Sequence, residues 1–157
     1  DNNITVFGPE VKALAGRYLA QMINELEQTA DPLGEKDSAW DMVELVVPHQ
    51  ANKTMVIQLA EKAGLSPDLI YFDIERAGNT SSASIPIAIA DAVADGVISK
   101  PTKIFAPGFG AGSVGGYTIM TIDPSVVVSG TEEVAIVEAV RSDPGETGSD
   151  SAATAFS

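Results

Sequence analysis

The sequence predicts an α/β domain in which helices cover both faces of a mixed, mostly parallel sheet. Two observations indicate this class. Short apolar runs, typical of buried strands, occur at residues 43–47, 69–72, 103–106 and 117–122. Longer stretches in which apolar residues recur at helical spacing lie before and between these runs. With 157 residues and 45% apolar content, the chain can form one domain or half of a larger one.

The first element is predicted as a helix that starts at Gly8-Pro9 and ends near Gln28. Proline is tolerated in the first turn of a helix. From Val11 to Leu26 the apolar residues recur at helical spacing, so one face of this helix should be buried.

A strand–helix–strand unit follows. The apolar run 43–47 is predicted as a buried strand, residues 50–63 as a helix that Gly64 ends, and residues 69–72 as a second strand. A helical connection of this length favours parallel pairing of the two strands. His49, the only histidine, comes just after the first strand, where open α/β sheets bind ligands.

A second long helix is predicted from about residue 83 to residue 95, where Gly96 follows. From Ala83 to Ala94 only Ser84 and Asp91 are markedly polar. A helix that is apolar on nearly all sides has no face for solvent. We therefore expect this helix to be fully enclosed between layers.

The runs 103–106 and 117–122 are predicted as antiparallel neighbours, because a tight glycine-rich segment joins them. That segment contains Gly110-Ala-Gly-Ser-Val-Gly115, which has the spacing of a dinucleotide fingerprint. The fingerprint requires a helix after its last glycine, and a strand pattern follows here. A tight hairpin, or small residues whose N–H groups form an oxyanion hole, are the two interpretations left open.

Residues 125–157 differ in character from residues 1–124. They contain a possible edge strand at 126–128 and a possible short helix at 131–141, and they end in a Ser/Gly/Asp/Ala-rich tail predicted to be disordered. We predict a domain at 1–124 and an extension beyond it.

Composition excludes several classes of protein. A net charge of −13, with 22 acidic and 9 basic residues, argues against nucleic acid and anionic membranes as partners. No apolar run is long enough to span a bilayer and no signal peptide is recognisable, so we expect a cytoplasmic protein. The chain has no cysteine, which excludes disulfides and a cysteine nucleophile within it, and no residues show metal-ligand spacing.

Single polar residues remain ambiguous by themselves. His49 could be a strand-end histidine bonded to the backbone, Asn79 a turn residue, and the serines at 81, 82 and 84 caps or small packing residues. A serine hydrolase is disfavoured because no G-x-S-x-G elbow occurs.

Three segments in order change this assessment. Pro48-His-Gln-Ala-Asn52, Gly78-Asn-Thr-Ser-Ser-Ala-Ser-Ile-Pro86 and Gly108-Phe-Gly-Ala-Gly112 resemble the C-terminal half of β-ketoacyl-acyl-carrier-protein synthase III, a condensing enzyme of the thiolase superfamily. The resemblance covers roughly residues 6–123. It implies a five-layer αβαβα fold of two similar halves, in which the helix 83–95 is one of a central pair.

The resemblance also implies roles for individual residues. A cysteine of the first half would be acylated, and His49 and Asn79 would donate hydrogen bonds to a malonyl thioester as it loses carbon dioxide and becomes an enolate. Ala111 would supply an oxyanion-hole N–H for the acyl-enzyme, with Gly110 beside it, and Phe109 would line the pocket.

Substrates and partners follow from the same resemblance. It implies acyl-CoA with malonyl-ACP or malonyl-CoA as substrates, no cofactor, a cysteine-bearing N-terminal thiolase-like half, and a dimer. Asn52 would contact the pantetheine arm. Thr54, with Lys53 beside it, stands where the family often has an arginine that docks acyl carrier protein, so the alternatives are a coenzyme A thioester or a different carrier-docking surface. Two other functions remain open: acyl transfer to a non-malonyl acceptor, and a non-catalytic subunit of a heteromeric enzyme.

Overall fold

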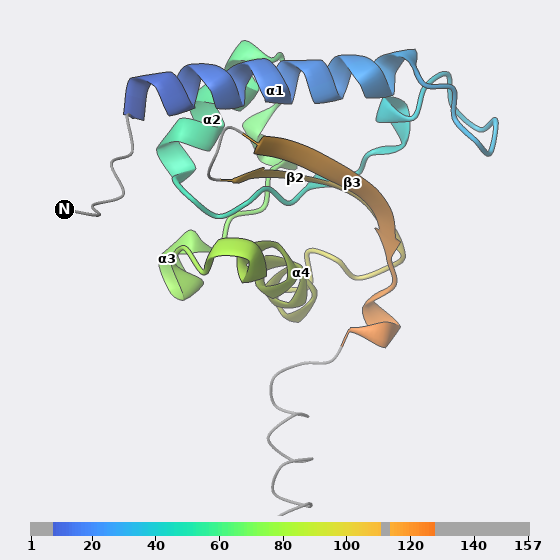
Figure 1. Ribbon diagram of the computed structural model, residues 1–157. Coiled ribbons are helices and arrows are strands. Elements are labelled where there is room, and N and C mark those ends of the chain that lie inside the picture. Colours follow the sequence, from blue (N-terminus) through green and yellow to red (C-terminus); the bar gives the residue numbers. More distant parts are fainter. Residues whose placement is uncertain (1–7, 111–113, 128–157) are drawn as a thin grey trace, which may run out of the picture. The chain divides into compact units, whose positions relative to one another are not determined.

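The computed structural model describes residues 8–110 and 114–127, in which helices lie on both sides of a small sheet (Figure 1). The helices are α1 (Gly8–Gln28), α2 (Lys53–Lys62), α3 (Ile74–Ala77) and α4 (Ser84–Ala94). The strands are β1 (Leu45–Val46), β2 (Thr102–Gly110) and β3 (Val114–Ile122). Short 3-10 turns occupy 40–42, 67–69, 81–83 and 124–126. The predicted helix at 131–141 and the predicted tail lie outside the described residues.

The sheet is mixed, as predicted, with the strand order β1-β2-β3. β1 is parallel to β2, with Leu45 opposite Ile104. β2 and β3 are antiparallel from Thr102–Ile122 to Gly110–Val114. The expected predominance of parallel pairing is wrong for the described residues, because β2 and β3 each extend over nine residues whereas β1 has two.

The predicted strand at 69–72 is reduced to a single parallel bridge between Ile70 and Val46. Pro67 starts a 3-10 turn that Ser66 caps with its side chain. Since α3 already begins at Ile74, little extended chain remains to pair. The parallel direction was predicted correctly, and the length was not.

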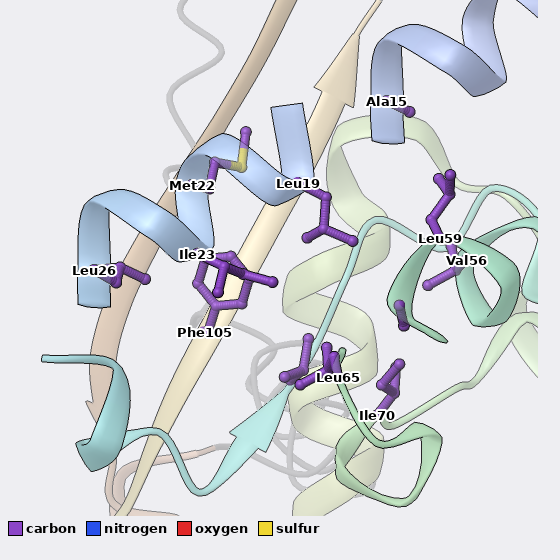
Figure 2. Packing of buried hydrophobic residues seen from close by; sticks show 12 residues of the cluster. Ala15, Leu19, Met22, Ile23, Leu26, Val56, Leu59, Leu65, Ile70 and Phe105 are labelled. Carbon is purple, nitrogen blue, oxygen red and sulfur yellow. The ribbon is translucent and has the colours of Figure 1, made fainter. Parts of the chain in front are cut away.

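The first face of the sheet is covered by α1 and α2 (Figure 2). Side chains of successive strand residues point to opposite faces. Val46 and Phe105 therefore pack under α1 and α2, with Trp40 meeting the Phe105 ring edge-on at 5.4 Å between ring centroids. We call this buried cluster the α1–α2 face. The predicted bounds of α1 are confirmed.

The second face carries α4, which Figure 1 shows on the other side of β2 and β3 from α1. Leu45, Val47, Ile104 and Ala106 point to this face and pack with Ala88 and Ala92, among other residues. We call it the α4 face. The prediction of helices on both faces of the sheet is confirmed.

Helix α4 has the predicted span, and Gly96 follows it with a φ of 74°. Its predicted full enclosure is wrong for this chain by itself. Only Ser84, Ala88 and Ala92 are buried, while Pro86 and Ala94 are exposed. The reason is that the described residues form one sheet, which can cover only one side of the helix.

Helix α2 begins at Lys53 rather than at Gln50. Asn52 is extended, with a φ of −158°, and its side chain accepts a hydrogen bond from the N–H of Met55. This is a helix N-cap. Residues 50–52 therefore form a connection between strand and helix, which keeps His49 outside the helix.

Candidate active site

His49 lies at the carboxyl end of β1, held there by backbone pairing. The N–H of Val47 donates to the Phe105 carbonyl and the N–H of His49 donates to the Pro107 carbonyl, both at 2.9 Å. The parallel ladder thus continues past the end of β1 as far as His49. This fixes the histidine backbone beside the Gly108–Gly110 end of β2, at the sheet edge where ligands bind in α/β folds.

The side chain of Gln50 holds the segment around His49 in place through hydrogen bonds to the backbone. Its side chain is 2% exposed. Its Nε2 donates to the Pro48 carbonyl at 2.8 Å, and its Oε1 accepts from the N–H of Asp73 at 2.9 Å. A buried amide with its groups paired in this way makes a rigid connection. Gln50 had no predicted role, since no local pattern indicates a partner 23 residues away.

The imidazole of His49 contacts Ser84, in the first turn of α4. The distance from His49 Nδ1 to Ser84 Oγ is 2.8 Å. The same Oγ accepts a hydrogen bond from the N–H of Gln50 at 3.2 Å. One ring nitrogen is therefore occupied by a side chain that is 2% exposed, and Nε2 is left for a ligand.

Asn79 lies in a turn whose backbone is unusual. Gly78 has φ 69° and ψ −164°, and Ser81 has φ 59°. The first of these conformations is one that glycine alone adopts readily. Asn79 Oδ1 accepts a hydrogen bond from the N–H of Ser81 at 3.0 Å. The acceptor of the amide is occupied, so its NH2 group is the part available to a ligand.

The side chains of His49 and Asn79 line one open cleft of about 610 Å³. Its lining consists of His49, Asn79, Ser81, Ser82, Ile85, Gly108, Phe109 and Gly110. Four of the predicted site residues, from three separate segments, thus meet in one place. Ala111 lies outside the described residues.

Asn52, the fifth predicted site residue within the described ranges, does not line this cleft. Its Oδ1 caps α2 through the N–H of Met55 at 2.9 Å. The side chain is exposed. Its structural role is therefore clear, and a contact with pantetheine stays a prediction.

The strands on either side of the glycine-rich segment pair with each other up to Gly110 and Val114. β3 begins at Val114, so a strand follows where a dinucleotide fingerprint needs a helix. Gly115 faces α1, where a Cβ atom would lie 3.0 Å from the Tyr18 ring. A side chain at this position would therefore press on the Tyr18 ring. The hairpin interpretation is confirmed by the β2–β3 register, and the oxyanion-hole interpretation stays a prediction.

An ion-pair network supports the loop that carries Asn79. Arg76 in α3 donates to Asp73 and to Asp95, and it also contacts the Tyr71 hydroxyl. Hydrogen bonds from Arg76 and then from Tyr71 lower the pKa of Asp95 to about 2. Burial, followed by the hydrogen bond to Asp95, raises the pKa of Tyr71. The network ties α3, just before Gly78, to the end of α4.

Asp73 also affects a second carboxyl group on α4. A hydrogen bond with Asp73, together with burial, raises the pKa of Asp91 above its ordinary 3.8.

Within the residues that the structure describes, no cluster of three or more His, Cys, Asp or Glu side chains could hold a metal ion. None of the helices among these residues is long and apolar enough to cross a membrane.

The arrangement of elements is that of a thiolase-like fold, as comparison with solved structures shows. β-Ketoacyl-acyl-carrier-protein synthase III from Thermus thermophilus superposes with a TM-score of 0.64 and 29% identity, over 79% of this chain and 37% of that one. The Aquifex aeolicus synthase III gives a TM-score of 0.61 and 32% identity, over 77% of this chain and 38% of that one.

Sequence comparison defines the family. The model of the 3-oxoacyl-[acyl-carrier-protein] synthase III C-terminal family matches residues 33–122. β-Ketoacyl-acyl-carrier-protein synthase III of Symbiobacterium thermophilum is 34% identical over 69% of this chain and 31% of its own length. That of Clostridium botulinum is 34% identical over 76% of this chain and 35% of its own length. The chain belongs to the 3-oxoacyl-acyl-carrier-protein synthase III C-terminal family. It spans about a third of the length of these relatives.

Proposed function

We propose that this chain provides the enolate-stabilising half of a condensing enzyme that joins an acyl thioester to a malonyl thioester. One observation carries the proposal. In both His49 and Asn79 one polar atom is already bonded within the protein, His49 Nδ1 to Ser84 and Asn79 Oδ1 to Ser81. Both side chains line the same cleft, where the second nitrogen of each could donate a hydrogen bond to a ligand. Two N–H donors in one cleft suit an oxygen that gains negative charge.

The chemistry needs such donors at one step. When the malonyl thioester loses carbon dioxide, the electron pair of the broken C–C bond moves onto the thioester carbonyl and forms an enolate. N–H groups from His49 and Asn79 would stabilise that oxygen, each by on the order of 3 kcal/mol of barrier. The enolate carbon then attacks the acyl-enzyme carbonyl. The new C–C bond forms as the cysteine leaves as a thiolate.

The acylated cysteine must come from elsewhere, because this chain has none. We place it in a thiolase-like first half, to which the uncovered side of α4 would dock, and the protein made of both halves would be a dimer. Phe109, half-buried at the cleft, would line the pocket for the acyl chain. An N–H of Ala111, next to Gly110, would stabilise the oxyanion formed when the acyl-enzyme is attacked. No cofactor takes part in this scheme.

The surface at the start of α2 favours a coenzyme A thioester over an acidic carrier protein as the malonyl donor. Lys53, the first residue of α2, forms an ion pair with Glu75 at 2.9 Å, and it lies over the Phe72 ring. Its charge is therefore already balanced. Thr54 adds none, and the chain as a whole carries −13. Such a surface attracts an acidic protein weakly.

A split between acylation and condensation tests the proposal. The chain is joined to, or mixed with, its cysteine-bearing half, and His49→Ala is compared with wild type. Intact-mass measurement after incubation with acyl-CoA should show full acylation of the cysteine in both. Condensation with malonyl-CoA should fall at least about a hundredfold in the variant. Undiminished condensation would remove His49 from the reaction.

A second variant isolates the Asn79 donor. Asn79→Asp keeps an oxygen for the Ser81 N–H but replaces the NH2 donor with a second acceptor. Because the turn is retained, the fold should be unaffected while condensation is lost.

Product analysis with malonyl and non-malonyl acceptors identifies the reaction. The alternative is transfer of the acyl group to a hydroxyl, an amine or a second acyl chain. If such a product forms and none forms from malonyl-CoA, the reaction is acyl transfer and the proposed condensation is wrong.

A further inference from the structure

We infer that Ser84 is a positioning residue that selects the tautomer of His49 in which Nε2 carries the proton. The catalytic consequence rests on the proposed function, whereas the tautomer itself does not. The inference arises from one buried hydroxyl on α4 that contacts two groups at the end of β1.

Counting protons at Ser84 Oγ gives the tautomer. The backbone N–H of Gln50 can only donate, so Ser84 Oγ is the acceptor of that 3.2 Å hydrogen bond. The hydroxyl hydrogen must then find an acceptor, because an unpaired buried donor is costly. Among the described residues, the acceptor in contact with it is His49 Nδ1 at 2.8 Å. If Nδ1 accepts, the proton of the neutral ring is on Nε2.

The opposite tautomer would leave the site one acceptor short. With a proton on Nδ1, Ser84 Oγ would accept from both His49 and Gln50, and its own hydrogen would have no partner in the contacts that the structure describes. Ser84 is 2% exposed, which makes a compensating water at the hydroxyl difficult. The Nε2–H tautomer satisfies all three groups.

The supporting helix makes the arrangement rigid. Ser84, Ala88 and Ala92 form the buried side of α4 against the sheet, while the His49 backbone is bonded to β2 through Pro107. The imidazole is therefore held between two elements that are packed together independently of the cleft. Ser81 and Ser82 also line the cleft, but neither makes this bond to the ring.

Nitrogen NMR of the ¹⁵N-labelled chain is the direct test. Long-range ¹H–¹⁵N correlations from the ring C–H groups distinguish a protonated from an unprotonated ring nitrogen. The chain contains one histidine, so the signals need no assignment. At an alkaline pH where imidazole is neutral, wild type should show Nδ1 unprotonated and Nε2 protonated. A protonated Nδ1 in wild type would overturn the inference without any variant.

Three variants separate tautomer selection from general damage. Ser84→Ala should move both ring signals toward the averaged values of a tautomer mixture, Ser84→Thr should restore the wild-type pattern, and Ser82→Ala should not change it. If Ser84→Ala keeps the wild-type ring signals, Ser84 does not select the tautomer. The backbone amide spectrum reports whether each variant is folded, and the wild-type spectrum decides alone if Ser84→Ala is not.

Activity provides the second readout, in the chain combined with its cysteine-bearing half. Ser84→Ala should lower kcat of condensation by about tenfold or more while cysteine acylation and KM stay close to wild type. An unchanged kcat would contradict a positioning role. If His49→Ala leaves condensation intact, the proposed function fails and the NMR result still stands. If Nδ1 is protonated in wild type, the inference that Ser84 selects the tautomer fails, whereas the proposed role of His49 in condensation is not affected.

Discussion

The two faces of the sheet differ in how completely this chain covers them. On the α1–α2 face, large side chains such as Leu19 and Phe105 are 4% and 0% exposed. On the α4 face, the helix buries two alanines and a serine, while isoleucines of the same helix are only half-buried. The first face forms a finished core. The second has apolar surface left over, and Ile85, which packs on it, also lines the cleft.

This difference places the candidate site on the unfinished side of the molecule. The isoleucines of α4 are half-buried, and apolar surface of this kind can be covered by a partner. His49 and Asn79, the proposed donors, are both hydrogen-bonded within the chain, which contains no cysteine. Under the proposed function, the α1–α2 face would stabilise the fold and the α4 face would bind the half that completes the site.

The largest effect should come from truncating the finished face. Leu19→Ala removes a buried side chain and should cost about 2–5 kcal/mol of unfolding free energy. The matched control is Ile87→Ala on α4, where a half-buried side chain is shortened and about 1 kcal/mol or less should be lost. Urea unfolding followed by circular dichroism measures both. Equal losses would mean that the two faces are equally packed.

Self-association should follow the unfinished face. Sedimentation velocity of this chain alone should show an apparent mass that rises with concentration, because the half-buried isoleucines of α4 are only partly covered by the chain itself. Ile87→Glu should shift the distribution toward monomer with little change in the urea midpoint. A chain that stays monomeric at high concentration without the substitution would argue that α4 needs no cover.

The cap of α2 offers a smaller effect on the finished face. Asn52→Ala removes the hydrogen bond to Met55 and should cost about 1 kcal/mol. Asn52→Ser keeps a capping oxygen and should cost much less. If Asn52 also contacts pantetheine, the serine variant should raise KM for malonyl-CoA although its stability is near wild type. An unchanged KM would leave Asn52 with the cap alone.

The smallest effect should come from the exposed Arg76–Asp95 pair beside the α4 face. The pKa of Asp95 is lowered from 3.8 to about 2, so its ionised form contributes stability above about pH 4 and that contribution is lost as pH falls through about 2. Asp95→Asn should be slightly less stable than wild type near neutral pH. The difference between their urea midpoints should shrink as the pH is lowered. A difference that grows instead would contradict a stabilising role of ionised Asp95.

Residue patterns predicted the elements whose signals are local. Proline at the start and regular apolar spacing predicted both ends of α1, and the glycine-rich segment between two apolar runs predicted the antiparallel β2–β3 pair. The prediction that His49 follows a buried strand was also correct. It needed only the local sequence, because His49 is close to that apolar run in the chain.

Features that depend on distant contacts, or on local caps and turns, were missed or mistaken. Ser84 approaches His49 across 35 positions of sequence and Gln50 reaches Asp73 across 23, so no spacing rule connects them. The Asn52 cap and the Pro67 turn shortened elements that hydrophobic pattern alone had lengthened. The full enclosure of α4 was predicted from its apolar composition, whereas the sheet of this chain buries only one side of the helix.

Amide hydrogen exchange tests the central claim, that one face is finished within the chain and the site-bearing face is not. In the isolated chain, amides of α1 and β2 should exchange slowly and those of α4 markedly faster, since exchange follows local stability. Adding the cysteine-bearing half should slow α4 and leave α1 unchanged. If α4 is already as protected as α1 in the isolated chain, the α4 face is complete and the account is wrong.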